Sequence, residues 1–130
     1  MQDRPTVLEL LAAVRTFLEE DIVPGLEGRK RFHALVSANV LDILERELGG
    51  EEAALLAEWT RLARLLGLGG AQPPERMTAL RAAVHELTEQ LAERIRRGDA
   101  DAGPWAEAVR AHVRETVVEK LRVANPRYLK

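Results

Sequence analysis

The spacing of apolar residues predicts helices along almost the whole chain of 130 residues. Apolar positions recur every three or four residues, which is the period of a helix with one buried face. Glycine and proline separate these segments, as they do at the ends of helices. We therefore predict five helices, over residues 6–23, 28–48, 51–66, 74–98 and 104–124.

Residues at the ends of these segments are typical of helix caps. Thr6 and Glu9 have the spacing of a capping box at the start of the first helix. Gly49-Gly50 predicts the end of the second helix, and Pro104 fits the first position of the last one. Because the connections are short, the expected fold is all-α, a single-domain antiparallel bundle of about five helices over residues 1–130.

The helix predicted over residues 28–48 has apolar residues on two faces. The residues of its main row are Phe32, Leu35, Val36, Asn39, Val40 and Ile43. Those of its second row are Leu41, Leu44 and Leu48. A helix that is apolar on two sides is usually packed on both, so we expect it at the centre of the bundle. The narrow arc left for solvent contains Ala38, Asp42, Glu45 and Arg46.

The three later helices each have one predicted inner face. Over residues 51–66 it contains Leu55, Leu56, Trp59, Leu62, Ala63 and Leu66. Over residues 74–98 it contains Met77, Leu80, Val84, Leu87, Leu91 and Ile95, at a spacing close to a heptad. Over residues 104–124 it contains Trp105, Val109, His112, Val113, Thr116, Val117 and Leu121.

Composition narrows the classes of protein to consider. The chain has no cysteine, which excludes disulfides, thiolate metal sites and a thiol nucleophile. Its formal net charge of −2 provides no electrostatic attraction to nucleic acid or to an anionic membrane. No apolar run approaches the roughly 20 residues of a membrane span, and the first residues lack the layout of a signal peptide. We expect a cytoplasmic protein. Its 31% of charged residues and lack of cysteine suit a thermophilic source, whereas its use of Arg, Ala, Leu and Gly would also be favoured by a high-GC genome.

Side chains that could carry catalysis are scattered. His33, His85 and His112 lie on three different predicted helices, and none belongs to a Glu-x-x-His metal motif. Ser37 lies inside a helix without the turn that exposes a nucleophile. We therefore predict no catalytic residue, cofactor or metal ion. The basic segment 29–31 favours a solvated surface over a small-anion site.

Asn39 is the polar residue that most needs an explanation, because it lies in the main apolar row of residues 28–48. A buried amide without a hydrogen bond costs about 1–3 kcal/mol. We interpret it as a residue that sets helix register or binds the backbone of the C-terminal tail. The alternative is a ligand-facing amide in a pocket between residues 28–48 and 104–124. The candidate residues of that pocket are Asn39, His33, His112 and Arg46.

Three segments resemble a bacterial all-helical domain family of unknown function, and together they span nearly the whole chain. They are Asp3–Thr6 with Leu10-Leu11 and Phe17-Leu18, Arg31–Asn39 continuing to Arg46–Leu48, and Lys120–Leu129. The resemblance implies a helical domain found beside or fused to phosphotransferases of the aminoglycoside/choline-kinase type and acyl-CoA dehydrogenases. It implies no catalytic residues. In the tail, we expect Asn125 to cap the last helix, and Arg127 and Tyr128 to dock on the bundle, with Tyr128 near the end of residues 28–48.

Two functions follow from these patterns. The first is a non-enzymatic accessory domain that binds a protein, either itself as a homodimer or a phosphotransferase-like or dehydrogenase-type enzyme. The second is a small-molecule-binding or catalytic bundle with a pocket near Asn39 and His112. The balanced charge argues against a third, a DNA-binding helical domain.

Overall fold

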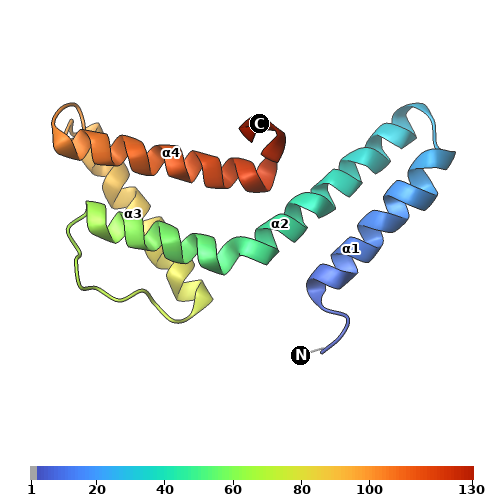
Figure 1. Cartoon of the computed structure of the whole chain (residues 1–130), viewed down its shortest axis with the longest axis horizontal. Helices are drawn as coiled ribbons and strands as arrows, with labels where there is room; N and C mark the ends of the chain where they lie inside the picture. The colour runs from blue at the N-terminus through green and yellow to red at the C-terminus, as the bar shows by residue number, and fades with distance from the viewer. Residues whose placement is uncertain (1–2) are drawn as a thin grey trace. The chain divides into compact units, whose positions relative to one another are not determined.

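The computed structural model describes residues 3–130, and within that range the fold is all-α (Figure 1). Its four α-helices are α1 (Val7–Phe17), α2 (Gly28–Leu65), α3 (Met77–Arg96) and α4 (Pro104–Ala124). A π-helical turn, Leu18–Ile22, and a 3₁₀ turn, Val23–Gly25, follow α1, and a second 3₁₀ turn, Pro126–Leu129, follows α4. The all-helical class is confirmed, whereas the expected count of about five helices is not.

The missing fifth helix has a simple cause, which is that α2 continues through Gly49-Gly50. Neither glycine has a positive φ, so their backbone follows the helix. Glycine inside a helix costs only about 1 kcal/mol, and the strong helix-forming residues on both sides outweigh that cost. The helix ends instead at Leu65, and Gly67, two residues further on, has a φ of +77°. There the Leu68 N–H donates to the Ala63 carbonyl at 2.8 Å, as in a Schellman motif.

The contacts of the chain divide it into two compact units, and the division falls within α2 just after Gly50. The first unit contains the chain up to Gly50 together with Arg122–Tyr128 and Lys130. The second contains Glu51–Leu121 and Leu129.

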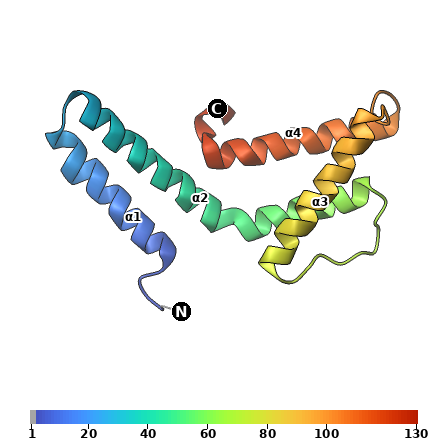
Figure 2. The same ribbon diagram turned by 180° about the vertical axis from the view of Figure 1, so that it is seen from behind.

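The second unit holds the main hydrophobic core. In it α4 runs back beside the C-terminal half of α2, and α3 crosses them (Figures 1 and 2). The buried members of this core are Trp59, Leu62, Ala63, Leu80, Val84, Leu87, Leu91 and Val109. Most residues of the three predicted inner faces are buried or half-buried, as expected. Four residues expected on those faces are exposed instead: Leu56, Ile95, Val113 and Val117.

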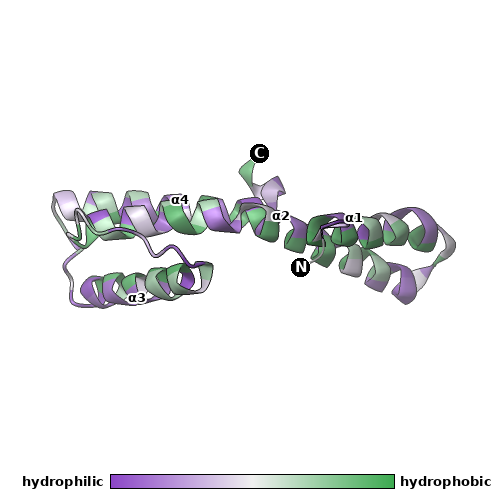
Figure 3. Ribbon diagram, turned by 90° about the horizontal axis from the view of Figure 1, so that it is seen from below, coloured by the Kyte–Doolittle hydropathy of each residue, from purple (hydrophilic) through white to green (hydrophobic). Residues whose placement is uncertain are grey.

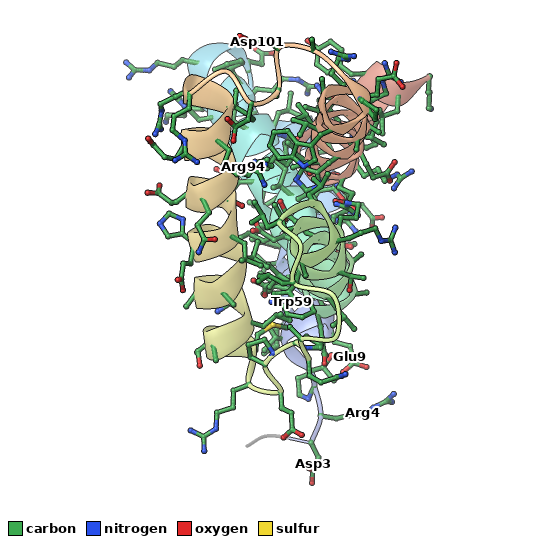
Figure 4. All side chains as sticks on the ribbon, turned by 90° about the vertical axis from the view of Figure 1, so that its left-hand side faces the viewer. Asp3, Arg4, Glu9, Trp59, Arg94 and Asp101 are labelled. Atoms are coloured by element: carbon green, nitrogen blue, oxygen red, sulfur yellow. The ribbon has the colours of Figure 1, made fainter. Side chains whose placement is uncertain are left out.

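Polar contacts to Trp105 connect the ends of all three helices in this unit. The Trp105 indole N–H donates to the Leu65 carbonyl at 2.9 Å, which fastens the start of α4 to the end of α2. The guanidinium of Arg94, a residue of α3 that is labelled in Figure 4, lies 4.0 Å from the centre of the Trp105 ring. Arg94 also donates to Asp99 at 3.0 Å. Cation–π contact and hydrogen bonds thus hold this end of the unit together.

The first unit is built on a hairpin in which α1 runs antiparallel to the N-terminal half of α2 (Figure 1). The predicted capping box begins α1, since the Glu9 N–H donates to Thr6 Oγ1 and the Thr6 N–H donates to Glu9 Oε2. At the turn, Arg31 donates to the Val23 carbonyl at 3.0 Å. Farther along, Arg15 donates to Glu45 at 2.8 Å and so joins the two helices.

The side of α2 that faces α1 is the arc we expected to face solvent, so that expectation is wrong. Ala34 and Ala38 are buried, Ala38 to 1% exposure. Glu45 on the same side binds Arg15. Alanine lets two helices approach closely, and the ion pair satisfies the charges along the contact line. Helix packing here therefore uses small residues instead of the large apolar ones on either side.

Candidate functional site

Helix α1 shows the first feature of a candidate site, because none of its 11 residues is buried. Four large apolar side chains on one side of it are exposed by 47% to 63%: Val7, Leu10, Val14 and Phe17. An isolated helix of this length is marginal in water, and most helices are stabilised by burying an apolar face. Figure 3 shows the hydrophobic residues of α1 as green segments along the ribbon. This helix is thus amphipathic but has its apolar side open.

Helical geometry places part of α2 on the same side of the hairpin. The contact line is fixed by Arg15 on α1 and by Ala38 and Glu45 on α2. At 100° per residue, the second row of α2, which contains Leu41, Leu44 and Leu48, lies to one side of this contact line. The same geometry places Val14 of α1 on that side as well. Leu44 and Leu48 of this row are 38% and 47% exposed. We call the combined surface the α1/α2 face; its residues are Val7, Leu10, Leu11, Val14, Phe17, Leu18, Leu41, Leu44 and Leu48.

The main row of α2 lies on the opposite side of the hairpin and is also exposed. Phe32, Leu35, Val36 and Val40 are exposed by 43% to 62%. Asn39 lies among them and is exposed, so the expectation of a buried amide is not met. The reason is that α1 packs on the neighbouring alanine arc and leaves this row uncovered within its unit.

His33 and Arg46, two other candidate pocket residues, make separate local contacts. His33 is exposed and accepts a hydrogen bond from Arg29 at 3.2 Å. Arg29, the first residue of the basic segment 29–31, therefore has a partner within the chain. Arg46 is half-buried and pairs with Asp42. Its Nε donates to the Val123 carbonyl at 2.7 Å, which satisfies a carbonyl at the end of α4.

Arg46 therefore holds the last turn of α4, while the C-terminal tail folds into a turn through its own backbone, unlike the expectation. Asn125 precedes the 3₁₀ turn, and its side chain makes no capping hydrogen bond there. Its carbonyl accepts from the Tyr128 N–H at 3.2 Å. Arg127 is exposed, and the Tyr128 side chain is 76% exposed, so the predicted docking of these two side chains is wrong. The cause is the tight turn after Pro126, which directs the tail by backbone hydrogen bonds.

His112 is the one predicted site residue that is buried, at 7% exposure. It lies on α4 in the second unit, close to the ion pair between Arg61 of α2 and Glu119 of α4. That pair is bidentate, with Arg61 donating to the two carboxylate oxygens at 2.9 and 2.6 Å. Three buried polar atoms here have no hydrogen-bond partner within residues 3–130: Arg61 Nε, His112 Nδ1 and Thr116 Oγ1.

The electrostatics of this cluster favour a neutral imidazole. Burial lowers the pKa of His112, the nearby Arg61 lowers it further, and Glu119 opposes them. Glu119 in turn raises the pKa of Arg61 by its hydrogen bond. Sequence reasoning missed Arg61 and Glu119. The signal was present, because residues 112, 116 and 119 follow one another at helical spacing on the inner face of α4.

The described chain also contains a groove on its surface. An open groove of about 430 Å³ lies in the second unit, lined by Leu66, Glu89, Gln90, Glu93, Arg94 and Arg97. Residues 3–130 contain no group of three or more acidic or histidine side chains placed to hold a metal ion. In the same part of the chain, no helix is both long and apolar enough to cross a membrane.

Fold and surface together define a small all-helical protein with an open apolar face. Comparison with protein families adds that residues 24–128 match the family described as "Domain of unknown function (DUF6285)". The chain belongs to this family. No curated protein matches it, and no solved structure does. The family description names no activity.

Proposed function

We propose that this protein is a non-enzymatic helical interaction domain that binds another protein through the α1/α2 face. The observation that carries the proposal is the exposure of that face, in which all nine residues are apolar and α1 buries none of its own. Exposing such a surface to water is unfavourable, and covering it with a protein is favourable.

The size of the face supports the same function. Six of its side chains are exposed by 38% to 63%. Together they expose the equivalent of about three whole side chains, which at about 150–200 Å² each is roughly 450–600 Å² of apolar area. That is in the upper half of the range for the largest patch on an ordinary monomer, and patches of this size commonly mark binding sites.

The partner we propose is either a second copy of the chain or an enzyme. The resemblance described above favours a phosphotransferase of the aminoglycoside/choline-kinase type or an acyl-CoA dehydrogenase, in the cytoplasm of a bacterium. Nucleic acid is a poor fit because the net charge is only −2. The face itself is uncharged, and it suits a partner that presents apolar helices.

A binding experiment with one variant tests the function. Phe17→Glu places a charge in the middle of the face, on a side chain that is 52% exposed and belongs to the first unit. Its matched control is Leu68→Glu, because Leu68 is 41% exposed and lies in the loop after α2. Sedimentation velocity of the purified chain, alone and mixed with each enzyme type encoded beside its gene, should show a complex for the wild type.

The expected result is that Phe17→Glu removes the complex and Leu68→Glu keeps it. Thermal unfolding of both variants should still show the cooperative transition of the second unit, since neither residue lies in its core. A wild-type chain that sediments as a monomer in every mixture contradicts the proposal. Equal binding by wild type and Phe17→Glu also contradicts it.

A further inference from the structure

We infer that the α1/α2 face is covered by the α1/α2 face of a second copy of this chain, in a two-fold symmetric four-helix arrangement. The inference rests on the proposed function and names its partner. It is carried by three properties of the face, which are its chemistry, its spacing and its area.

The chemistry of the face allows it to pack against itself. A two-fold axis brings a surface against an identical copy of that surface, so any charge near the axis meets the same charge. Like charges placed together in this way oppose association. All nine residues of the α1/α2 face are uncharged and apolar, so self-packing meets no such repulsion. The main row of α2 is also uncharged, but it places the polar amide of Asn39 among its apolar residues, and burying an amide without a hydrogen bond is costly.

The spacing of the face matches helix bundles. On α1 the exposed residues Val7, Leu10, Val14 and Phe17 follow one another at steps of three, four and three. On α2 the row follows at three and four, through Leu41, Leu44 and Leu48. Steps that average 3.5 residues let nearly parallel or antiparallel helices interlock along their length. A hairpin with two such rows needs two more helices to close a bundle, and a second copy provides them.

The area of the face fits a weak dimer. With roughly 450–600 Å² of apolar surface on each copy, pairing buries about 900–1,200 Å² in total, the size of weak, reversible protein interfaces. An interface of this size is expected to be reversible, so its occupancy should depend on protein concentration. The four helices would also cover α1, which has no buried residue on its own.

The test compares two valines on opposite sides of the same hairpin. Val14 lies on the α1/α2 face and is 51% exposed, whereas Val36 lies in the main row of α2 and is 43% exposed. Sedimentation equilibrium at about 100 µM chain, which is above the range of micromolar dissociation constants, should give the wild type twice its 14.5 kDa chain mass. Val14→Glu should lower the mass to that of one chain, and Val36→Glu should leave a dimer.

A second variant guards against local unfolding of α1. Leu44→Lys changes the same face from α2 and should also give a monomer, with the helical content of the second unit intact by circular dichroism. Three results overturn the inference: a wild-type chain that is a monomer, a Val14→Glu variant that is a dimer, or a dimer that is lost only in Val36→Glu. If the wild type is a monomer but binds an enzyme in a Phe17-dependent manner, the self-pairing is wrong and the proposed function stands. If it binds neither itself nor an enzyme, both are wrong.

Discussion

Replacing His112 by leucine should remove a specific pH dependence from the stability of the second unit. The unfolded chain binds a proton on this histidine near pH 6.5. The folded chain binds it only at lower pH, because burial and the Arg61 charge lower the pKa of His112 more than Glu119 raises it. Above about pH 6.5 both states are neutral at this site, so the histidine adds no pH dependence there.

Below that pH the unfolded state binds more protons than the folded state, so the stability falls as the pH drops. The slope from one histidine is at most about 1.4 kcal/mol for each pH unit, until the folded pKa is reached. Chemical denaturation at a series of pH values from 8 to 5 measures this slope. We expect a steeper fall between pH 6.5 and the folded pKa in the wild type than in His112→Leu.

The control is His85→Gln, which changes an exposed histidine on α3 of the same unit. Because His112 is unchanged in this variant, the steeper fall that we assign to His112 should still be present. Parallel curves for the wild type and His112→Leu would refute the reasoning. So would an NMR titration in which the His112 ring takes its proton at or above pH 6.5.

Three further predictions concern the fold. Gly50→Ala should raise the free energy of unfolding by about 0.5–1 kcal/mol, because Gly50 is helical and has open space around it. Gly67→Ala should lower the free energy of unfolding, because Gly67 has a positive φ. Thermal unfolding measures both changes. Leu62→Ala should cost about 2–5 kcal/mol in urea unfolding because Leu62 is fully buried, whereas the same change at exposed Leu68 should have little effect. Glu119→Gln should cost about 1–2 kcal/mol because it removes half of a partly buried ion pair, and a double-mutant cycle with Arg61 should show the coupling.

The core of the second unit could be predicted from the sequence because its pattern is one-sided. Along α3 the apolar residues occupy a single face, and Leu80, Val84, Leu87 and Leu91 are all buried as expected. The start of α4 at Pro104 and the capping box at Thr6 were also predictable, since each depends on only a few neighbouring residues.

The packing of α2 could not be predicted in the same way. Hydrophobicity ranks Phe32 and Val36 above Ala38, yet Ala38 is buried and the other two are exposed. An apolar row has the same pattern whether its own chain or another chain covers it. The helix end predicted at Gly49-Gly50 was wrong for a related reason. A cost of about 1 kcal/mol per glycine is outweighed when the residues on both sides favour one long helix.

The candidate site residues were also predictable only in part. The burial of His112 followed from its place on the inner face of α4, but its ion-pair neighbours needed the structure. Asn39 was singled out because it interrupts an apolar row, and the structure shows that row exposed. What the sequence did contain was the amphipathic character of residues 7–17, which form part of the proposed interaction face.

Hydrogen exchange of α1 as a function of protein concentration tests the central claim most directly. Helix α1 has 11 residues and buries none, so its amides should exchange rapidly in dilute protein. Covering the α1/α2 face should slow that exchange. We predict that protection of residues 7–17 rises with the concentration of the chain or of an added partner, while protection of α3 stays constant. Protection of α1 that is the same at every concentration and with every partner would contradict the account.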